Sequence, residues 1–413
     1  MSKSFTQYFS RYAESELDTL ITHQALLPEN FLVENVLVIP AYQETSGFIE
    51  RFLASALSKS PVLMVVVINE PIKEPIDNNA RMKDNPQQKL YQFALSCGEV
   101  FWQYENLTLV KSSSSNAWLL VVDRFTHAID KDQGVGLARK IGSDLSAYLI
   151  SISRVKQPWI CSSDADAHLP SNYFSALNTR EKNSVVCCFN FHHSCDDKVV
   201  HQANHLYETA LRYYVAGLQY ANSPYAFFTI GSILAFKAES YVQVRGFPKR
   251  SAGEDFYLLN KLAKLGHVEF IEEVTIELDA RVSLRVPFGT GPAVQKIIEL
   301  QTNKQTYCYY NPEVFQQLKL TLAAFSQLWQ QKQSLESWLG LLPKQASSAL
   351  KSVQFEKFVT NQIKSDQIQF NKQLIVWFDA FKTLKFIHNL RENYYPDIPL
   401  QQAIESANFK IHP

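Results

Sequence analysis

Two aspartates one residue apart, Asp164 and Asp166, are the side chains in this chain whose spacing most strongly suggests chemistry. They follow the apolar run Trp159-Ile160-Cys161, which predicts a short buried strand ending at the two acids. In an open α/β sheet, ligands gather outside the carboxyl ends of the strands. Magnesium there takes one or two carboxylates and completes its shell with substrate phosphates. The pair therefore predicts a site for Mg²⁺ or Mn²⁺, and an Asp-rich turn or helix cap is the alternative.

Three other segments carry residues that could act together with this pair. The apolar run 36–39 is stopped by a proline, and the loop after it is able to hold a base or a ribose. A glycine-led helix start at 134–140 can direct cationic side chains towards phosphates. Two adjacent acids begin an apolar-periodic helix, where carboxylates also suit the helix dipole. The residues that these segments contribute are Pro40, Ala41, Tyr42, Glu44, Arg139, Glu254 and Asp255.

Composition limits the classes of protein to which the chain can belong. Its 413 residues suffice for two domains, and 46% hydrophobic with 19% charged residues is ordinary for a globular protein. The formal net charge of zero lacks the electrostatic footprint of a general nucleic-acid binder, so no nucleic-acid partner is expected. The six cysteines show no framework spacing, which favours a reduced, cytoplasmic setting.

Neither a secretory signal nor a membrane span is expected. The first 18 residues are polar and amphipathic. Residues 213–236 carry no charge and have about the length of a span, but polar residues interrupt the centre of the stretch. We expect a helix, a break at 222–224 and a buried strand. Whether residues 293–413 contact acceptor, a partner or a membrane surface stays open.

The positioning elements alternate between strands and helices. Apolar runs predict strands over 36–39, 62–68, 117–122, 159–161 and 185–191, and helices are expected over 48–57, 87–101 and 134–150. This order predicts an α/β fold with a mainly parallel sheet flanked by helices. The composition changes after residue 292, where apolar residues recur at helical spacing and only one glycine is found, which predicts a helical C-terminal region. We expect a helical lead-in over 1–34, a main domain over 35–292 and the helical region over 293–413.

Several other motifs fail on closer reading. Residues 134–139 begin like a dinucleotide fingerprint, but Arg139 stands where the third glycine should be, and no P-loop is present. Histidines at 192, 193, 201 and 205 with Cys195 suggest zinc, yet their spacing fits no common closed site and packing is favoured. Four tyrosines could line an acceptor pocket, although core packing is the default for such rings. They are Tyr213, Tyr214, Tyr220 and Tyr225.

The ordered set of motifs resembles the family 2 glycosyltransferases, which have the GT-A fold. Their pattern runs from a Val-Ile-Pro-Ala-Tyr-Asn-Glu strand through an Ala-Arg-Asn helix and Asp-x-Asp to a Gly-Gly-Phe…Glu-Asp segment. The resemblance covers roughly residues 35–290. Here the segments read Val38-Ile39-Pro40-Ala41-Tyr42-Gln43-Glu44, Ala138-Arg139-Lys140, Asp164-Ala165-Asp166 and Arg245-Gly246-Phe247…Glu254-Asp255.

This chain departs from the family pattern at three places, and the downstream His that completes the metal shell in many relatives is also not obvious after Asp255. Asn69-Glu70-Pro71 replaces the usual Asp-Asp-Gly-Ser, whose acid contacts the nucleobase, so the choice of base is open. Gln43 replaces an asparagine. Lys140 also replaces an asparagine, and we expect it to add a cation near the donor diphosphate.

The resemblance implies a hexosyltransferase that moves a sugar from a nucleotide-sugar donor to the hydroxyl of a glycan, a lipid-linked glycan or a small polyol. Asp166 would bind the metal directly and Asp164 the ribose or a water. Arg139 would assist the diphosphate, and Asn69 would lie by the base. Asp255, beside Glu254, would be the base of an inverting reaction, and a helix N-terminus would hold it ionised. The alternatives are a nucleotidyltransferase and a non-catalytic sugar-nucleotide or glycan-binding protein on the same fold.

Overall fold

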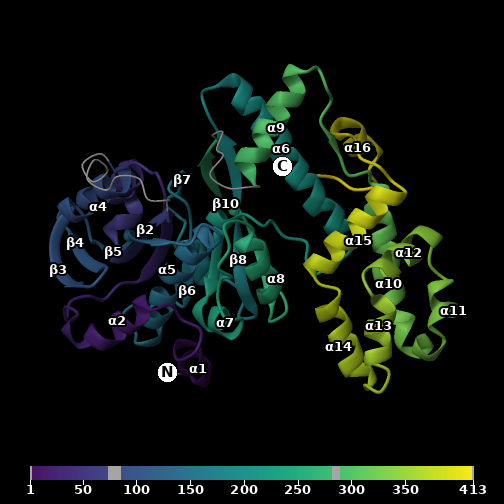
Figure 1. Ribbon diagram of the computed structural model, residues 1–413, viewed down its shortest axis with the longest axis horizontal. Coiled ribbons are helices and arrows are strands. Elements are labelled where there is room, and N and C mark those ends of the chain that lie inside the picture. Colours follow the sequence, from purple (N-terminus) through teal and green to yellow (C-terminus); the bar gives the residue numbers. More distant parts are fainter. Residues whose placement is uncertain (1, 73–84, 281–288, 412–413) are drawn as a thin grey trace. The chain divides into compact units, whose positions relative to one another are not determined.

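The computed structural model describes residues 2–72, 85–280 and 289–411, so part of the segment between the expected strand 62–68 and the expected helix 87–101 lies outside the described residues. Two compact units make up the chain (Figure 1). Residues 1–196 and 229–292 form an α/β unit, and residues 197–228 and 293–413 form a helical unit. Residues 197–228, which the sequence reading placed within the main domain, thus belong with the C-terminal helices by their contacts.

A ten-stranded sheet in the described chain organises the α/β unit. Its strands follow the order β3-β4-β5-β2-β1-β6-β9-β8-β10-β7, and β4, β7 and β9 run opposite to the others. The mainly parallel α/β architecture is therefore confirmed. The strands are β1 (Asn35–Ala41), β2 (Val62–Pro71), β3 (Gly98–Tyr104), β4 (Leu107–Ser112), β5 (Ala117–Ile129), β6 (Trp159–Ser162), β7 (Ala167–His168), β8 (Ser184–Ser194), β9 (Leu234–Lys237) and β10 (His267–Asp279).

Helices cover this sheet, and α5 (Gly134–Ser151) packs directly on β1 and β2. A glycine makes the close approach possible, because a Cβ on Gly142 would lie 2.4 Å from Cγ1 of Val38. The other helices of the unit are α1 (Lys3–Phe9), α2 (Glu16–His23), η1 (Gln24–Leu26), α3 (Gly47–Ala54), η2 (Ala56–Lys59), α4 (Pro86–Ser96), η3 (Ser175–Thr179), η4 (Gly231–Ile233), α7 (Ala238–Gln243) and α8 (Glu254–Leu262).

One helix boundary was predicted wrongly. Helix α4 ends at Ser96, and the residues expected to continue it form the edge strand β3. Gly98 begins this strand against Ser112, so close that an added Cβ would lie 1.8 Å from the carbonyl oxygen of Lys111. Strand β4 was not anticipated either, because its pairing partner in β3 had been assigned to a helix.

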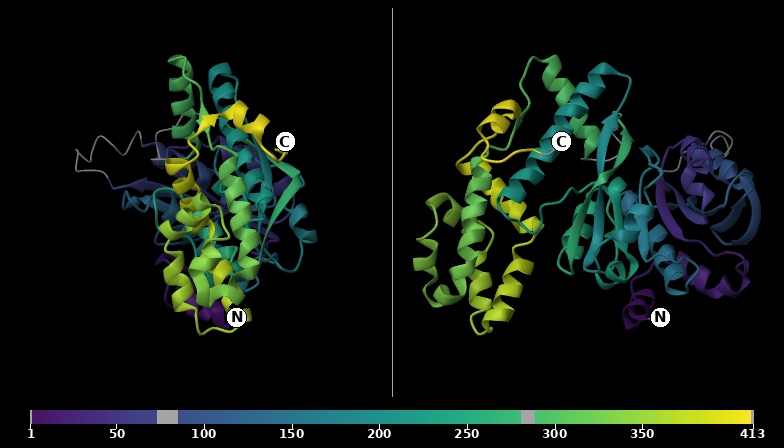
Figure 2. Two further views of the ribbon diagram at one scale, coloured as in Figure 1. Left: turned by 90° about the vertical axis from the view of Figure 1, so that its right-hand side faces the viewer. Right: turned by 180° about the vertical axis from the view of Figure 1, so that it is seen from behind.

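The helical unit is helical as expected, apart from a two-stranded ribbon. Its α6 and α9 lie side by side in Figures 1 and 2, packed through Ala203, Val294 and Ile297. A larger core forms around Phe315 and Trp338. The elements are α6 (Lys198–Tyr220), α9 (Thr290–Thr302), β11 (Cys308–Tyr309), α10 (Glu313–Gln331), η5 (Lys332–Ser334), α11 (Leu335–Leu339), α12 (Lys344–Ser352), α13 (Phe355–Asn361), α14 (Gln367–Trp377), α15 (Ala380–Asn393), β12 (Ile398–Pro399) and α16 (Leu400–Ser406).

The uncharged stretch 213–236 forms a helix end, a turn and a strand, as predicted. Helix α6 stops at Tyr220, Asn222 adopts a left-handed φ of 57°, and β9 follows. Within the described ranges, no helix combines the length and apolar character needed to cross a bilayer. All six cysteines are free.

Candidate active site

Arg139 is the centre of the polar cluster at the carboxyl end of β6. Its Nη2 donates to Oδ1 of Asp164 at 2.7 Å, and its Nε donates to Oε1 of Glu254 at 2.9 Å. Its Nη1 donates to Oγ of Ser162 at 2.8 Å and to the carbonyl of Ser163 at 3.2 Å. Three of the four segments singled out in the sequence therefore meet at one guanidinium, from α5, the end of β6 and the start of α8.

This guanidinium is almost sealed from solvent, with 3% of the side chain exposed. Burial acts to lower the pKa of Arg139, but the nearby carboxylates of Asp164, Glu254 and Asp255 outweigh it and raise that pKa. The guanidinium is therefore a permanent buried cation. Asp164, by contrast, is 34% exposed, so one end of the Arg139–Asp164 pair faces solvent.

Glycine at position 231 provides the space that Arg139 occupies. A Cβ on Gly231 would lie 2.6 Å from Nη2 and 2.9 Å from Cζ of Arg139. The carbonyl of the same glycine accepts a hydrogen bond from the hydroxyl of Ser162 at 3.2 Å, and the hydroxyl of Ser163 donates to the carbonyl of Ser232 at 3.1 Å. The backbone around residue 231 thus fixes both the guanidinium and the end of β6.

The start of α5 is fixed by a second close approach. The N–H of Gly136 donates to the carbonyl of Arg250 at 2.9 Å, and an added Cβ there would lie 2.5 Å from the carbonyl oxygen of Pro248. The glycines of the failed dinucleotide fingerprint therefore allow α5 to approach the segment that leads into Glu254 and Asp255.

The loop that carries Asp164 and Asp166 is held from two sides. Nη2 of Arg51 on α3 donates to the carbonyls of Ala165 at 3.0 Å and Ala167 at 3.2 Å. The N–H of Asp279 donates to the carbonyl of Asp166 at 2.9 Å. The short strand β7 then pairs antiparallel with β10, which brings the carboxyl end of β10 beside the acidic loop.

Asp279 and His168 are site residues that the sequence reading missed or set aside. Nε2 of His168 lies 2.8 Å from Oδ1 of Asp279, and both side chains are at least a third exposed. No role was assigned to either residue from the sequence. Asp279 could have been found from the sequence because it ends a strand-like run, and Asp164 was identified from its position just after such a run.

Glu254 and Asp255 begin α8 as predicted, after Gly253, whose φ of 72° favours glycine. Burial raises the pKa of Glu254 above its usual value, although Arg139 opposes the shift. Burial, followed by the charge of Glu254, raises the pKa of Asp255 to about 7, and the N–H of Phe256, 2.7 Å from Oδ1 of Asp255, opposes this.

The helix N-terminus was expected to hold Asp255 ionised at neutral pH, but a pKa of about 7 divides the group between its two protonation states there. The favourable N–H contact exists, but desolvation and the neighbouring carboxylate of Glu254 outweigh it. A carboxyl group with a pKa near neutrality can both take up and release a proton at physiological pH, which suits an acid–base group.

The first two parallel strands end beside each other. In their register Ala41 of β1 faces Ile68 of β2, so the loop with Tyr42 and Glu44 starts next to Asn69. Pro40 and Ala41 are buried, and Gln43 adopts a left-handed φ of 55°. Asparagine adopts that conformation more readily than most residues, so Gln43 holds a backbone position that asparagine would also suit.

Asn69 carries a buried atom that lacks a partner. Only 5% of the residue is exposed, and its Oδ1 has no hydrogen-bond partner within the described structure. Buried amide oxygens are usually paired, so this oxygen is an unsatisfied acceptor at the end of β2. The neighbouring Glu70 accepts from Nδ2 of Asn85 at 3.0 Å.

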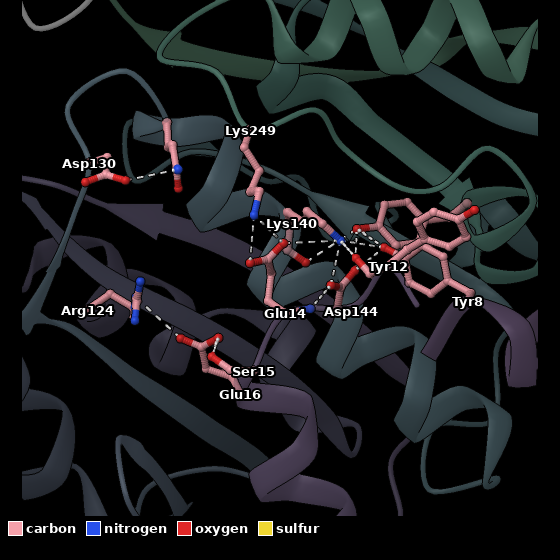
Figure 3. A network of polar contacts seen from close by, with 12 residues as sticks. Tyr8, Tyr12, Glu14, Ser15, Glu16, Arg124, Asp130, Lys140, Asp144 and Lys249 are labelled. Carbon is pink, nitrogen blue, oxygen red and sulfur yellow. Dashed lines mark hydrogen bonds and ion pairs between the residues drawn. The ribbon is translucent and has the colours of Figure 1, made fainter. Parts of the chain in front are cut away.

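Lys140 does not point towards these groups, which corrects the expectation that it adds a cation near the diphosphate. One residue further along α5 than Arg139, it faces another side of the helix, where its Nζ lies 2.9 Å from Oδ2 of Asp144 (Figure 3). It also donates to the hydroxyl of Tyr8 at 2.8 Å and the carbonyl of Tyr12 at 2.7 Å. This network anchors the N-terminal segment to α5.

The carboxylates at the end of β6 suit a cation site that a substrate completes. Across residues 2–72, 85–280 and 289–411, no group of three or more His, Cys, Asp or Glu side chains is arranged to hold a metal ion. Magnesium with substrate phosphates needs only one or two protein carboxylates. Asp164 and Asp166 stand on the loop at the end of β6, with Asp164 one third exposed, and the described residues His192, His193 and Cys195 are not grouped for zinc.

Comparison with known proteins leaves the chain without a family assignment. No protein-family model matches it, and no curated protein matches it. Among solved structures, residues 1–349 of S. aureus TarS in complex with UDP-GlcNAc match at 11% identity and a TM-score of 0.39, over 87% of this chain and 89% of that one. A mycobacterial protein matches at 10% identity and a TM-score of 0.32, over 67% and 79%. At these TM-scores the matches support no functional assignment.

Proposed function

We propose that the α/β unit transfers a sugar from a nucleotide-sugar donor to an acceptor hydroxyl, with inversion and with a divalent cation. The observation that carries the proposal is the buried Arg139, which holds Asp164 at the end of β6 and Glu254 at the start of α8. Because its hydrogen bonds are all made inside the protein, Arg139 fixes these two acidic segments against each other at the strand ends rather than contacting the leaving group itself. The resemblance to family 2 glycosyltransferases assigns the same segments to donor binding and catalysis.

The donor would bind along the ends of β1, β2 and β6. The unpartnered Oδ1 of Asn69 can accept a hydrogen bond from an N–H of a nucleobase. The loop with Tyr42 and Glu44 would hold the base or ribose, and the exposed part of Asp164 would contact the ribose or a water. Because Asn69 is a neutral amide with both donor and acceptor atoms, it leaves the choice of base open.

A divalent cation, Mg²⁺ or Mn²⁺, would be held by Asp166 with Asp164 and would supply charge stabilisation to the leaving diphosphate. Asp279 and His168 lie at the same loop through the contact with the carbonyl of Asp166. Arg51 keeps the loop in position by binding the two carbonyls that flank Asp166. Arg139 does not depend on the cation for its placement, because its contacts are all within the protein.

Asp255 is the proposed base. As the acceptor oxygen bonds to the anomeric carbon, its proton passes to the Asp255 carboxylate, and the bond from the anomeric carbon to the diphosphate oxygen breaks with its electron pair leaving on that oxygen. Attack opposite the leaving group inverts the configuration. With a pKa of about 7, Asp255 must lose its proton before it can act, so the rate should rise as the pH passes through neutrality.

Release of nucleoside diphosphate from a panel of UDP-, GDP- and TDP-sugars, and of CMP from CMP-sugars, tests the proposal, with Mg²⁺ or Mn²⁺ and a mixture of glycan and polyol acceptors. We expect release with one donor class. Asp255→Asn should abolish release and keep nucleotide binding, whereas Asp166→Ala should lose the metal-dependent part of that binding. Full turnover in Asp255→Asn would show that the base is assigned wrongly. Nucleotide binding without any turnover would favour a non-catalytic binding protein.

A further inference from the structure

A second group of residues suited to ligand binding lies wholly within the helical unit. Five tyrosines form it, and we call them the tyrosine cluster. Ring centroids are 4.8 Å apart between Tyr309 and Tyr310, 6.1 Å between Tyr307 and Tyr309, and 5.6 Å between Tyr214 and Tyr310. Tyr207 lies on the same face of α6 as Tyr214, two turns away, and packs in the same small core as Tyr307.

The hydroxyl groups distinguish this cluster from the other tyrosines of the unit. Three neighbouring tyrosines are fully paired: the hydroxyl of Tyr213 donates to the carbonyl of Tyr310 at 2.9 Å, that of Tyr225 to the carbonyl of Ile375 at 3.0 Å, and that of Tyr220 to Oε1 of Gln316 at 2.5 Å. Tyr213 and Tyr225 therefore belong to the core and do not line a pocket for the sugar acceptor, because both side chains are buried and their hydroxyls are paired.

Three hydroxyls of the cluster have no such partner. Those of Tyr214, Tyr307 and Tyr309 make no hydrogen bond to any described residue, and none of these atoms is sealed from solvent. The rings are half-buried, and burial raises the pKa of each of the three. A tyrosine that is mostly enclosed usually finds a partner for its hydroxyl, so three together leave unused hydrogen-bonding capacity in one place.

A carboxylate lies beside the rings. The ribbon pairs Tyr309 of β11 with Ile398 of β12, which brings Asp397 next to Tyr310. The Asp397 side chain makes no hydrogen bond or ion pair with a described residue. The charged and titratable groups around it are Arg391, His388 and Lys296, which act to lower its pKa but are outweighed by burial. His388 itself lies 2.9 Å from the Tyr310 hydroxyl through Nε2.

We propose that the tyrosine cluster with Asp397 is a saccharide-binding subsite. The three unpaired hydroxyls and the carboxylate offer hydrogen bonds to the hydroxyl groups of a sugar, and the half-buried rings that carry those hydroxyls supply apolar surface for its C–H groups. Rings that pack on each other at 4.8 to 6.1 Å do not enclose a cage for a quaternary ammonium ion. A lipid chain would leave the hydroxyls and Asp397 unpaired.

This proposal does not depend on sugar transfer by the α/β unit. Binding at the cluster needs no nucleotide and no cation, and the residues belong to the helical unit alone. If the transfer also holds, the subsite gives the chain a means of retaining a glycan.

Binding of the full-length protein to a panel of neutral and acidic di- to tetrasaccharides, without nucleotide or metal, tests the proposal by calorimetry. The variants are Tyr307→Phe, Tyr309→Phe, Tyr309→Ala and Asp397→Asn, and thermal unfolding of each checks its fold. Tyr394→Ala is the matched control, because Tyr394 is 38% exposed on the same unit and its ring contact is with Tyr395.

We expect one saccharide class to bind. Tyr309→Ala and Asp397→Asn should weaken it by roughly tenfold or more, the two Phe variants by less, and Tyr394→Ala not at all. The proposal is overturned if no saccharide binds, or if folded Phe and Asn variants bind like the wild type. It also fails if Asp255→Asn removes saccharide binding while the cluster variants keep it, because the sugar would then sit at the transfer site.

Discussion

Replacing Gly231 by alanine is a small change with a large expected effect on donor binding. The added Cβ would lie 2.6 Å from Nη2, 2.9 Å from Cζ and 3.1 Å from Nε of Arg139. An ordinary contact needs at least about 3.4 Å, so the guanidinium must move by nearly 1 Å. The hydrogen bonds that would lengthen are those to Asp164 at 2.7 Å and to Glu254 at 2.9 Å.

The magnitude follows from the charge-assisted character of these bonds. A hydrogen bond to a charged group contributes about 1.5–3 kcal/mol, and each 1.4 kcal/mol corresponds to about tenfold in affinity. If the displaced carboxylates must regain their positions when nucleotide binds, that cost is taken from binding, and Gly231→Ala should weaken affinity for the recognised nucleotide by roughly ten- to a hundredfold. Calorimetric titration with UDP, GDP, CMP and TDP in the presence of Mn²⁺ measures this for the wild type and the variant.

Gly47→Ala is the matched control. A Cβ on Gly47 would meet only Oγ1 of Thr45 at 3.8 Å, an ordinary contact. The dissociation constant of the Gly47→Ala variant for the recognised nucleotide should equal that of the wild type. If Gly231→Ala keeps its fold, shown by its unfolding temperature, and still binds nucleotide as tightly as the wild type, then Arg139 does not organise a donor site.

Three further predictions concern individual charged residues. Asp255→Asn should stabilise the protein at pH 8 but not at pH 4. The folded state holds a proton on Asp255 up to about pH 7 and the unfolded state releases it near pH 4, so the wild-type protein loses at most about 4 kcal/mol of unfolding free energy as the pH rises between these values. Equal unfolding temperatures of variant and wild type at pH 8 would contradict the raised pKa. Lys140→Met should lower the free energy of unfolding by about 3–5 kcal/mol, because it leaves Asp144 buried without its cation. Chemical denaturation measures this loss, and nucleotide affinity should stay within about twofold of the wild type. A loss of nucleotide affinity in the folded variant would place Lys140 at the donor site. Asp166→Ala should remove the dependence of nucleotide affinity on Mn²⁺, and an unchanged Mn²⁺ dependence would mean that the cation binds elsewhere.

The sequence predicted the strands of the central sheet because they are continuous apolar runs. β2 is buried over almost its whole length, so nearly every residue is apolar, and the signal cannot be confused with an amphipathic helix. The edge strand β3 was missed since its exposed residues dilute that pattern. Glu99 and Gln103 lie four residues apart with the apolar run 100–102 between them, so the segment lacks the period-two alternation that would oppose the helix signal from α4.

The site was predicted in outline and not in its geometry. Motif order indicated Arg139, Asp164 and Glu254, and the structure brings them together. Spacing along a helix could have excluded Lys140, because adjacent helical residues point about 100° apart and only one of them can face the end of β6. Gly231, Arg51 and Asp279 act through backbone contacts with segments distant in sequence, and such contacts leave no local pattern to read.

The most direct test of the central claim is a crystal structure of the full chain with Mn²⁺ and the nucleoside diphosphate that binds most tightly. The account predicts the diphosphate at the end of β6, with the metal on Asp166, the guanidinium of Arg139 retaining Asp164 and Glu254, and a base N–H against Oδ1 of Asn69. Nucleotide bound at another place, with the carboxylates at the end of β6 free of metal, would contradict it.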